Sequence, residues 1–330
     1  MTDELPQTAP DTQTRRLNRQ GRGSPAGTPM LLIFGVIFTG AGSAILLLAL
    51  DVIKVNPRQV NPHSLHAPPW VIEAIGSIFA GAGLLMLIGG VRGVRRALRR
   101  RRLSGLYPAE PWRADFAWDP SGFTASDRAG VLVCLAFGLF VIRFMTPFNW
   151  WGFRGGGGLF VIVLSGVFDL VGLGLVGYAL FLVLRWLKYG DSRLQFEGFP
   201  FFLGDVLTAA LVPHKGVRGC RRVTFTLRCI QERIEVTSSG RDSNTAEVCY
   251  QVWASSYEVE QPGDLAAGKL IPVTFLLPEE TGLGTALSDR PPRYWELEVA
   301  AAAPGIGYKA RFLVPVYVRA GKERAASVRG

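Results

Sequence analysis

Four long blocks of apolar residues dominate the first half of the chain. A hydrocarbon core about 30 Å thick needs roughly 20 apolar residues in a helix, and each block is long enough. The first block carries no charge and the second carries only Glu73. The third contains Arg143, and the fourth contains Asp169 and Arg185. Because lipid offers no partner to a bare peptide group, we expect helices. The four predicted spans are residues 30–50, 70–91, 129–148 and 159–187.

After the fourth block the spacing of apolar residues changes to a period of two. In VTFTLRC (223–229), every second side chain is apolar or Cys, and the others are Thr or Arg. Gly, Pro, Asn, Asp and Ser punctuate the gaps between such runs, as in SSGRDSN (238–244). Short alternating strands separated by turn residues predict an antiparallel β-sandwich. The predicted strands lie within residues 193–198, 205–212, 223–229, 246–253, 272–277, 294–300 and 308–316.

These patterns divide the chain into four parts. We expect a disordered tail over residues 1–28, because it is polar and rich in Pro, Gly, Ser and Gln. A four-helix membrane domain over 29–188 forms two hairpins, joined by an Arg-rich cytoplasmic loop at 92–128. A cytoplasmic sandwich at 191–318 and a flexible basic tail at 319–330 follow.

The repeated phrases GVIFTGAG (35–42) and GSIFAGAG (76–83) agree at six of eight positions, 41 residues apart (76 minus 35). Small residues allow membrane helices to approach closely and gain dispersion contacts. Glycines seven positions apart share a helix face, so we predict a tight antiparallel hairpin of the first two spans. The alternative is an inverted repeat around a transport site. Such a site usually has a central polar group and a proline that breaks the helix, and the phrases contain neither. The predicted packing residues are Gly35, Gly40, Gly42, Gly76, Gly81 and Gly83.

Arg143 and Asp169 are charges inside predicted spans, and such charges are costly in hydrocarbon. With the two spans antiparallel, their axial offset is roughly 8 Å, which a long Arg side chain can nearly close. We therefore predict an intramembrane ion pair that sets the register of the second hairpin. A proton or ion path, or an Arg143 side chain that reaches outward to the interface, are the alternatives.

The net charge of +10 comes mainly from Arg residues that flank the apolar blocks. Residues 191–316 carry 13 Lys and Arg against 15 Asp and Glu, so that region is close to neutral. By the positive-inside rule both termini are cytoplasmic, and we expect a multi-pass protein of the inner (cell) membrane. The first block exceeds the usual length of a cleaved signal core, so we interpret it as a span. We expect no nucleic-acid binding, because the basic residues are not interleaved with aromatic residues that could stack on bases.

The densest basic run, VRGVRRALRRRR (91–102), follows the second span. It is typical of a signal that fixes topology, and it can also bind anionic lipid head groups. Both roles are compatible. The residues concerned are Arg95, Arg96, Arg99, Arg100, Arg101 and Arg102.

Candidate catalytic chemistry is sparse in the sequence. We find no nucleophile elbow, P-loop or HExxH motif, and we expect neither an enzyme nor a cofactor. The four Cys residues form no CxxC pair. His63 and His66 could share a metal ion, but no third ligand is near, and we expect no metal site.

The run IPVTFLLPEE…ALSDRPPRYWELEVAAAAPGIGYKARFLVPV (271–316) resembles the later strands of arrestin-like β-sandwiches in the order of its phrases. The whole chain is similar to bacterial multi-pass membrane proteins of unassigned activity that end in such a domain. Unlike true arrestins, the chain has one sandwich, and we find no phosphate-sensing Arg/Asp core. Phosphoprotein recognition therefore does not carry over, and the resemblance implies a scaffold or adaptor role.

The predicted fold is a membrane α-helical domain of four helices in two hairpins, followed by a soluble all-β antiparallel sandwich of the Ig/arrestin-like kind. Two functions fit this fold. The first is a membrane-anchored adaptor whose sandwich binds a protein partner through an edge or loop. The alternative is a small channel or transporter component regulated by the sandwich, with Arg143 and Asp169 in its path.

Overall fold

A computed structural model describes residues 10–17, 28–50, 52, 69–154, 158–217, 219–220, 222–239, 242–260 and 267–319. Contacts divide the chain into two compact units. One unit is helical and contains Pro25–Leu98 and Arg128–Val183. The other contains the β-sheets and is assembled from Met1–Ser24, Arg99–Asp127 and Leu184–Gly330. Each unit is described on its own.

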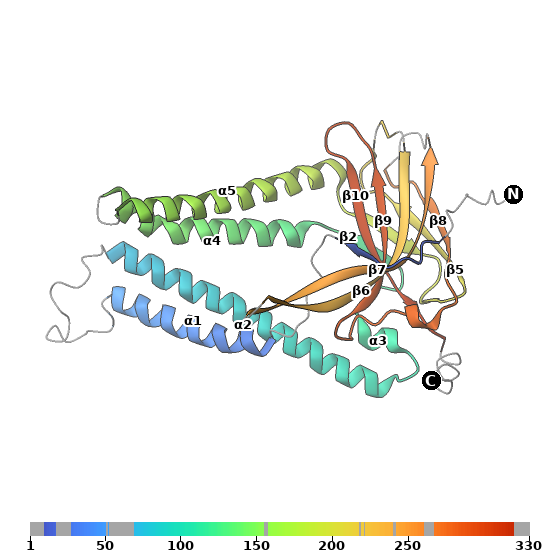
Figure 1. The fold of residues 1–330 in the computed structure, drawn as a ribbon, viewed down its shortest axis with the longest axis horizontal. Coiled ribbons are helices and arrows are strands. Elements are labelled where there is room, and N and C mark those ends of the chain that lie inside the picture. The colour runs from blue at the N-terminus through green and yellow to red at the C-terminus, as the bar shows by residue number, and fades with distance from the viewer. Residues whose placement is uncertain are drawn as a thin grey trace. The chain divides into compact units, whose positions relative to one another are not determined.

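Four long helices occupy the predicted apolar blocks (Figure 1). All four are long and apolar enough to cross a membrane. Their side chains outside the helix–helix contacts remain exposed, as expected where lipid takes the place of a protein core. The helices are α1 (Thr28–Ala49), α2 (Pro69–Leu106), α4 (Arg128–Phe153) and α5 (Gly158–Tyr189).

Helix α2 continues well beyond its apolar block, through the Arg-rich run to Leu106. The prediction of a loop from residue 92 was therefore wrong for this stretch. Arg, Leu and Ala are strong helix formers, and no proline interrupts the run before Pro108. A short helix, α3 (Pro111–Asp115), and a strand, β2 (Gly122–Ala125), fill much of the rest of this connection.

The second unit contains two main antiparallel sheets, which confirms the predicted β-sandwich. One sheet has the strand order β1-β7-β6-β9-β10, and the other has the order β2-β3-β5-β8. A two-stranded parallel sheet joins β11 to β4. The remaining strands are β1 (Arg15–Leu17), β3 (Ser192–Phe196), β4 (Phe201–Phe202), β5 (Val206–Val212), β6 (Arg222–Ser239), β7 (Asp242–Glu260), β8 (Ile271–Leu276), β9 (Arg293–Ala301), β10 (Tyr308–Val314) and β11 (Val316–Tyr317).

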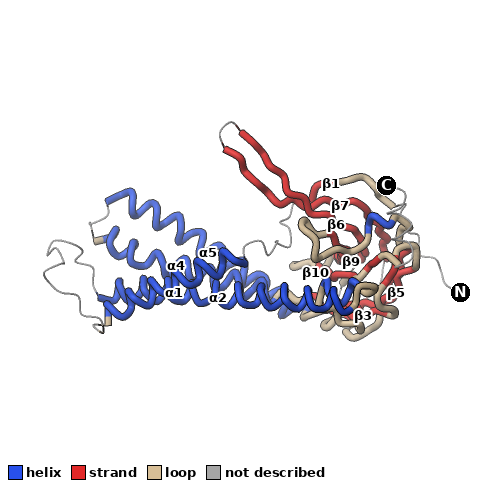
Figure 2. Tube along the Cα trace, turned by 90° about the horizontal axis from the view of Figure 1, so that it is seen from below, coloured by secondary structure: helices blue, strands red, loops and turns tan. Residues whose placement is uncertain are grey.

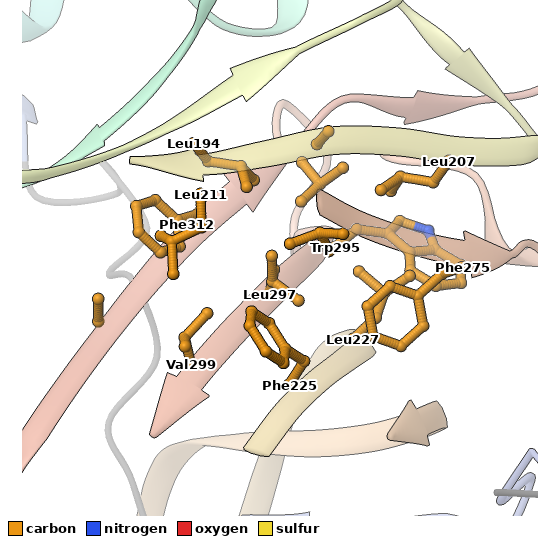
Figure 3. Packing of buried hydrophobic residues seen from close by; sticks show 14 of the residues in the cluster. Leu194, Leu207, Leu211, Phe225, Leu227, Phe275, Trp295, Leu297, Val299 and Phe312 are labelled. Carbon is orange, nitrogen blue, oxygen red and sulfur yellow. The ribbon is translucent and has the colours of Figure 1, made fainter. Parts of the chain in front are cut away.

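The core lies between the two sheets and is made by the alternating apolar positions of their strands. Figure 3 shows Trp295 and Leu297 of β9 close to Leu207 and Phe275 from the opposite sheet. Trp295 also packs against Trp253 of β7, with the ring centroids 4.9 Å apart. Aromatic side chains bury large apolar areas, so they supply much of the stabilisation of such a core.

Strands β6 and β7 are longer than the sequence pattern indicated. They pair from Arg222 and Glu260 to Ser239 and Asp242, with one register shift after Cys229. Their far halves project from the body of the sandwich as a two-stranded arm (Figure 2). Alternation alone could not predict this arm, because it buries little apolar surface.

Two strands come from segments that we placed outside the sandwich. β1 lies in the tail that we expected to be disordered, and it pairs with β7. β2 lies in the predicted loop and pairs with β3. The sandwich therefore does not consist of residues 191–318 alone. Both strands are short, and each is held mainly by hydrogen bonds to a longer neighbour, which explains why their sequences carry little signal.

Candidate functional site

Helices α1 and α2 approach most closely at two glycines of the repeated phrase. A Cβ added at Gly42 would lie 2.2 Å from the backbone N of Ala80. At Gly83 it would lie 2.3 Å from the backbone N of Thr39. Only glycine permits backbones this close, so the predicted tight crossing is present.

This crossing is pseudo-symmetric, because exchanging equivalent positions of the two phrases, which are 41 residues apart, converts one of these contacts into the other. The two phenylalanines of the repeat, Phe38 and Phe79, stack on each other with ring centroids 5.2 Å apart. The repeated phrase thus builds two copies of one contact in an antiparallel hairpin. The outer glycines follow the same rule, with Gly35 against Leu87 and Gly76 against Leu46.

Gly40 and Gly81 do not take part in this packing. A Cβ at either position would meet no other described atom within 4 Å. Gly40 lies two residues before Gly42, about 200° away around the helix, so it faces away from the partner helix. The prediction that these two glycines pack was wrong.

The predicted ion pair between Arg143 and Asp169 is also absent from the described residues. Asp169 instead accepts a hydrogen bond from Asn149 Nδ2 at 2.6 Å. Its other oxygen, Oδ1, is buried and has no partner in the described part of the chain. Arg143 is exposed. Asn149 lies six residues beyond Arg143, about 240° around the helix, so both cannot face α5.

Helices α4 and α5 have a close glycine contact of their own, which the sequence analysis missed. A Cβ at Gly138 would lie 3.0 Å from the carbonyl O of Gly172. These glycines are not part of a repeated phrase. Gly174 and Gly177, close by in the sequence, meet no described atom within 4 Å, so sequence alone does not single out Gly172.

The Arg-rich run lies on α2, and all six of its predicted site arginines are exposed. Arg100 also donates a hydrogen bond from its Nη1 to the carbonyl O of Ser288, 2.6 Å away. This contact joins two segments of the sandwich unit that are 188 residues apart in sequence. The arginines that form no such contact with the described residues are Arg95, Arg96, Arg99, Arg101 and Arg102.

A cavity of about 550 Å³ lies beside this contact, wholly within the sandwich unit. One wall is the end of α2 with the segment through α3, and the other is the loop between β8 and β9 with β11. Its polar lining residues are Arg100, Ser104, Tyr107, Asp115, Thr281, Thr285, Ser288, Asp289, Arg293 and Tyr317. We refer to it as the α2–β9 cavity.

Asp115, the last residue of α3, holds the two walls together. It accepts hydrogen bonds from the backbone N–H groups of Leu287 and Ser288, at 3.0 and 2.6 Å. The hydroxyl of Tyr317 donates to the same carboxylate at 3.1 Å and accepts from Trp118 Nε1 at 2.9 Å. Burial, and then the charge of Asp115, raise the pKa of Tyr317, so this phenol stays neutral.

The β-sheet side of the cavity carries a second guanidinium and a buried hydroxyl. Arg293 at the start of β9 donates from Nε to the carbonyl O of Gly284 at 2.8 Å. Thr285 lies in the same loop, and its Oγ1 is buried with no partner among the described residues. The cavity therefore presents positive and neutral hydrogen-bond donors, which suit an anionic group.

The described residues contain no cluster of three or more His, Cys, Asp or Glu that could hold a metal ion. His63 and His66 lie outside the described residues. Burial raises the pKa of the Cys229 thiol to about 12, so this sulfur is not a nucleophile at neutral pH.

Comparisons with known proteins give a partial likeness in fold. No family model matches the chain. No curated protein matches it either. Among solved structures, the sporulation control protein Spo0M from Bacillus subtilis is similar over 42% of this chain, with 15% sequence identity and a TM-score of 0.24. The match spans 55% of the Spo0M chain. The likeness concerns the fold of that part alone, and no activity or partner follows from it.

Proposed function

We propose that the protein is a membrane-anchored scaffold whose β-sandwich binds another protein at the cytoplasmic face of the inner membrane. The main support for this proposal is the way in which the sandwich unit is assembled from separate segments of the chain. It combines the segment before α1, the connection between α2 and α4, and the segment after α5. If all four helices cross the membrane, these three segments emerge on the same side. This agreement supports four spans with both termini on the Arg-rich, cytoplasmic side.

The docking surface that we favour is the edge of β8. This strand ends the four-stranded sheet and, in the part of the chain that the structure describes, pairs only with β5. Val206 and Leu276 face each other across these two strands and are 50% and 62% exposed. An exposed edge with apolar side chains suits the addition of a partner strand.

A crosslinked affinity isolation from native membranes tests this proposal. We would compare the full-length protein with a version truncated after Lys188 and with full-length Leu276→Arg. The matched control is Ile234→Arg, because Ile234 is similarly exposed, at 53%, but lies on the β6–β7 arm. We expect a protein that is recovered with the intact chain and the control, and lost with the other two versions. Equal recovery with all four would contradict the proposal.

A second function, a small channel or transporter component, is favoured by Asp169. A buried carboxylate oxygen without a partner, within an apolar helix, marks a candidate proton or cation path. Pro147 lies inside α4 close to Asn149 and removes one intrahelical hydrogen bond there. In reconstituted vesicles, Asp169→Asn should abolish proton or cation flux if this function is correct. Flux at the level of protein-free vesicles with the unaltered protein would contradict it.

A further inference from the structure

We infer that the α2–β9 cavity binds the phosphate group of a small molecule, held by Arg100, Arg293 and the hydroxyl of Thr285. A free phosphate ester and a phospholipid head group share this chemistry. The inference goes beyond the scaffold function and does not depend on it.

The two arginines are oriented by the cavity walls and still have donors to offer. Arg100 bonds to the carbonyl O of Ser288 at 2.6 Å, and Arg293 bonds to that of Gly284 at 2.8 Å. A guanidinium has five N–H donors in a rigid fork. Neither side chain forms another hydrogen bond within the described ranges, so most of these donors are available. Oriented guanidinium groups favour bidentate contacts with phosphate oxygens.

Thr285 gives an independent indication of a ligand. The residue is only 9% exposed and belongs to the cavity lining, and its buried hydroxyl has no hydrogen-bond partner in the described structure. A buried hydroxyl that forms no hydrogen bond is destabilising. An oxyanion in the cavity would satisfy it, and threonine hydroxyls commonly supplement arginine in phosphate contacts.

The formal charges of the lining cancel, Arg100 and Arg293 against Asp115 and Asp289, so the preference for an anion depends on which groups are already bonded. Asp115 faces the cavity, but its carboxylate already accepts three hydrogen bonds from the walls. Asp289 opposes binding, although it is exposed. The volume of 550 Å³ falls within the usual range for small-molecule sites, about 300–1,000 Å³.

Calorimetric titration of the full-length protein in a nonionic detergent tests the inference with two probes. Inorganic phosphate reports the shared chemistry, and dioctanoyl phosphatidic acid, compared with dioctanoyl phosphatidylcholine, reports a lipid source. We expect saturable binding that weakens at least tenfold in Arg100→Gln and in Arg293→Gln. Thr285→Val should weaken it several-fold, while folding is retained because the hydroxyl has no partner to lose among the described residues.

Two controls separate the cavity from a diffuse charge effect. Arg102→Gln removes a charge from the same helix outside the cavity and should leave binding unchanged. Arg293→Lys keeps the charge but loses the planar fork, so it should weaken binding less than Arg293→Gln and still measurably. Phosphatidic acid that binds far more tightly than inorganic phosphate would identify a lipid source, and equal affinities would identify a free ester. The inference is overturned if neither probe saturates, or if Arg102→Gln weakens binding as much as Arg100→Gln.

Discussion

At the residue scale, the glycines of the repeated phrase in α1 and α2 have different surroundings. Gly42 and Gly83 lie against the backbone of the partner helix, whereas Gly40 and Gly81 face open space. The same residue type, two positions apart, is thus required at one position and tolerated at the other. Sequence identity between the repeats cannot reveal this, because all four glycines are shared.

We expect Gly42→Ala and Gly83→Ala to destabilise the hairpin by about 1–3 kcal/mol each, because the new methyl group overlaps backbone atoms. Gly40→Ala and Gly81→Ala are matched controls. They should be neutral or stabilise by up to about 1 kcal/mol, because alanine favours helix. Thermal unfolding of the detergent-solubilised protein measures both pairs. Equal effects at all four positions would contradict the crossing described here.

Glu298 on β9 is the centre of a charge cluster on the sandwich. Its carboxylate forms ion pairs with Arg228, Lys309 and Arg311, at 3.0, 3.1 and 2.8 Å. Burial favours the neutral form, but these three cations outweigh it and hold the pKa of Glu298 below its usual value. Its side chain is only 15% exposed, so solvent screens these interactions weakly.

The lowered pKa of Glu298 predicts a loss of stability in acid. The stabilisation is fully present above the unfolded-state pKa of about 4.3 and disappears as the pH falls through the lower folded-state pKa. Glu298→Gln should therefore lower the free energy of unfolding at pH 7 by about 1–3 kcal/mol and flatten its decline below about pH 5. Glu258→Gln is the control, because Glu258 forms an exposed ion pair with Arg222 and should change stability little. An unchanged acid profile in Glu298→Gln would refute this account.

At the element scale, β1 closes part of an edge of the five-stranded sheet. Leu17 pairs with Cys249 of β7 and packs on a small cluster that includes Ile230, Tyr294 and Leu313. An edge strand with unpaired backbone groups is a template for association. A short strand from the N-terminal segment therefore covers β7 within the same chain.

We expect Leu17→Asp to release β1, because the carboxylate cannot enter this apolar cluster. The exposed edge of β7 should then raise the fraction of dimer or aggregate in size-exclusion chromatography. Arg15→Asp changes the same strand at an exposed position and serves as the control. A monomer fraction that is the same in both variants would show that β1 does not protect this edge.

At the scale of the whole molecule, the sandwich draws on three segments separated in sequence by helices that are long and apolar enough to span a membrane. This arrangement predicts that all three lie on one side of the bilayer. The predicted side is the cytoplasm, because basic residues concentrate in these segments.

Labelling of single cysteines with a membrane-impermeant maleimide checks this topology in intact cells. With Cys134 replaced by Ala, Arg154→Cys should react from outside, because it follows α4 at the predicted outer end. Lys215→Cys is exposed on the sandwich and should react only after the membrane is permeabilised. The buried Cys220, Cys229 and Cys249 should remain unlabelled in the folded protein. Labelling of Lys215→Cys in intact cells would reverse the proposed orientation.

The amino-acid sequence by itself determined the positions of the four helices and most of the sandwich strands. Long apolar runs and period-two alternation are local consequences of burial, so they can be identified without a fold. The tight α1–α2 hairpin was predictable for the same reason, since glycines spaced by two turns share a face. Arg100 was likewise identified, but only as one of a basic run.

Only the tertiary structure decided which polar groups meet. Asn149 instead of Arg143 reaches Asp169, because the helical rotation of α4 determines which side chain faces α5. Arg100, Asp115, Thr285 and Arg293 come together in one cavity because the connection between α2 and α4 folds onto the sandwich. Such contacts depend on chain closure over long separations, and neither composition nor periodicity encodes them locally.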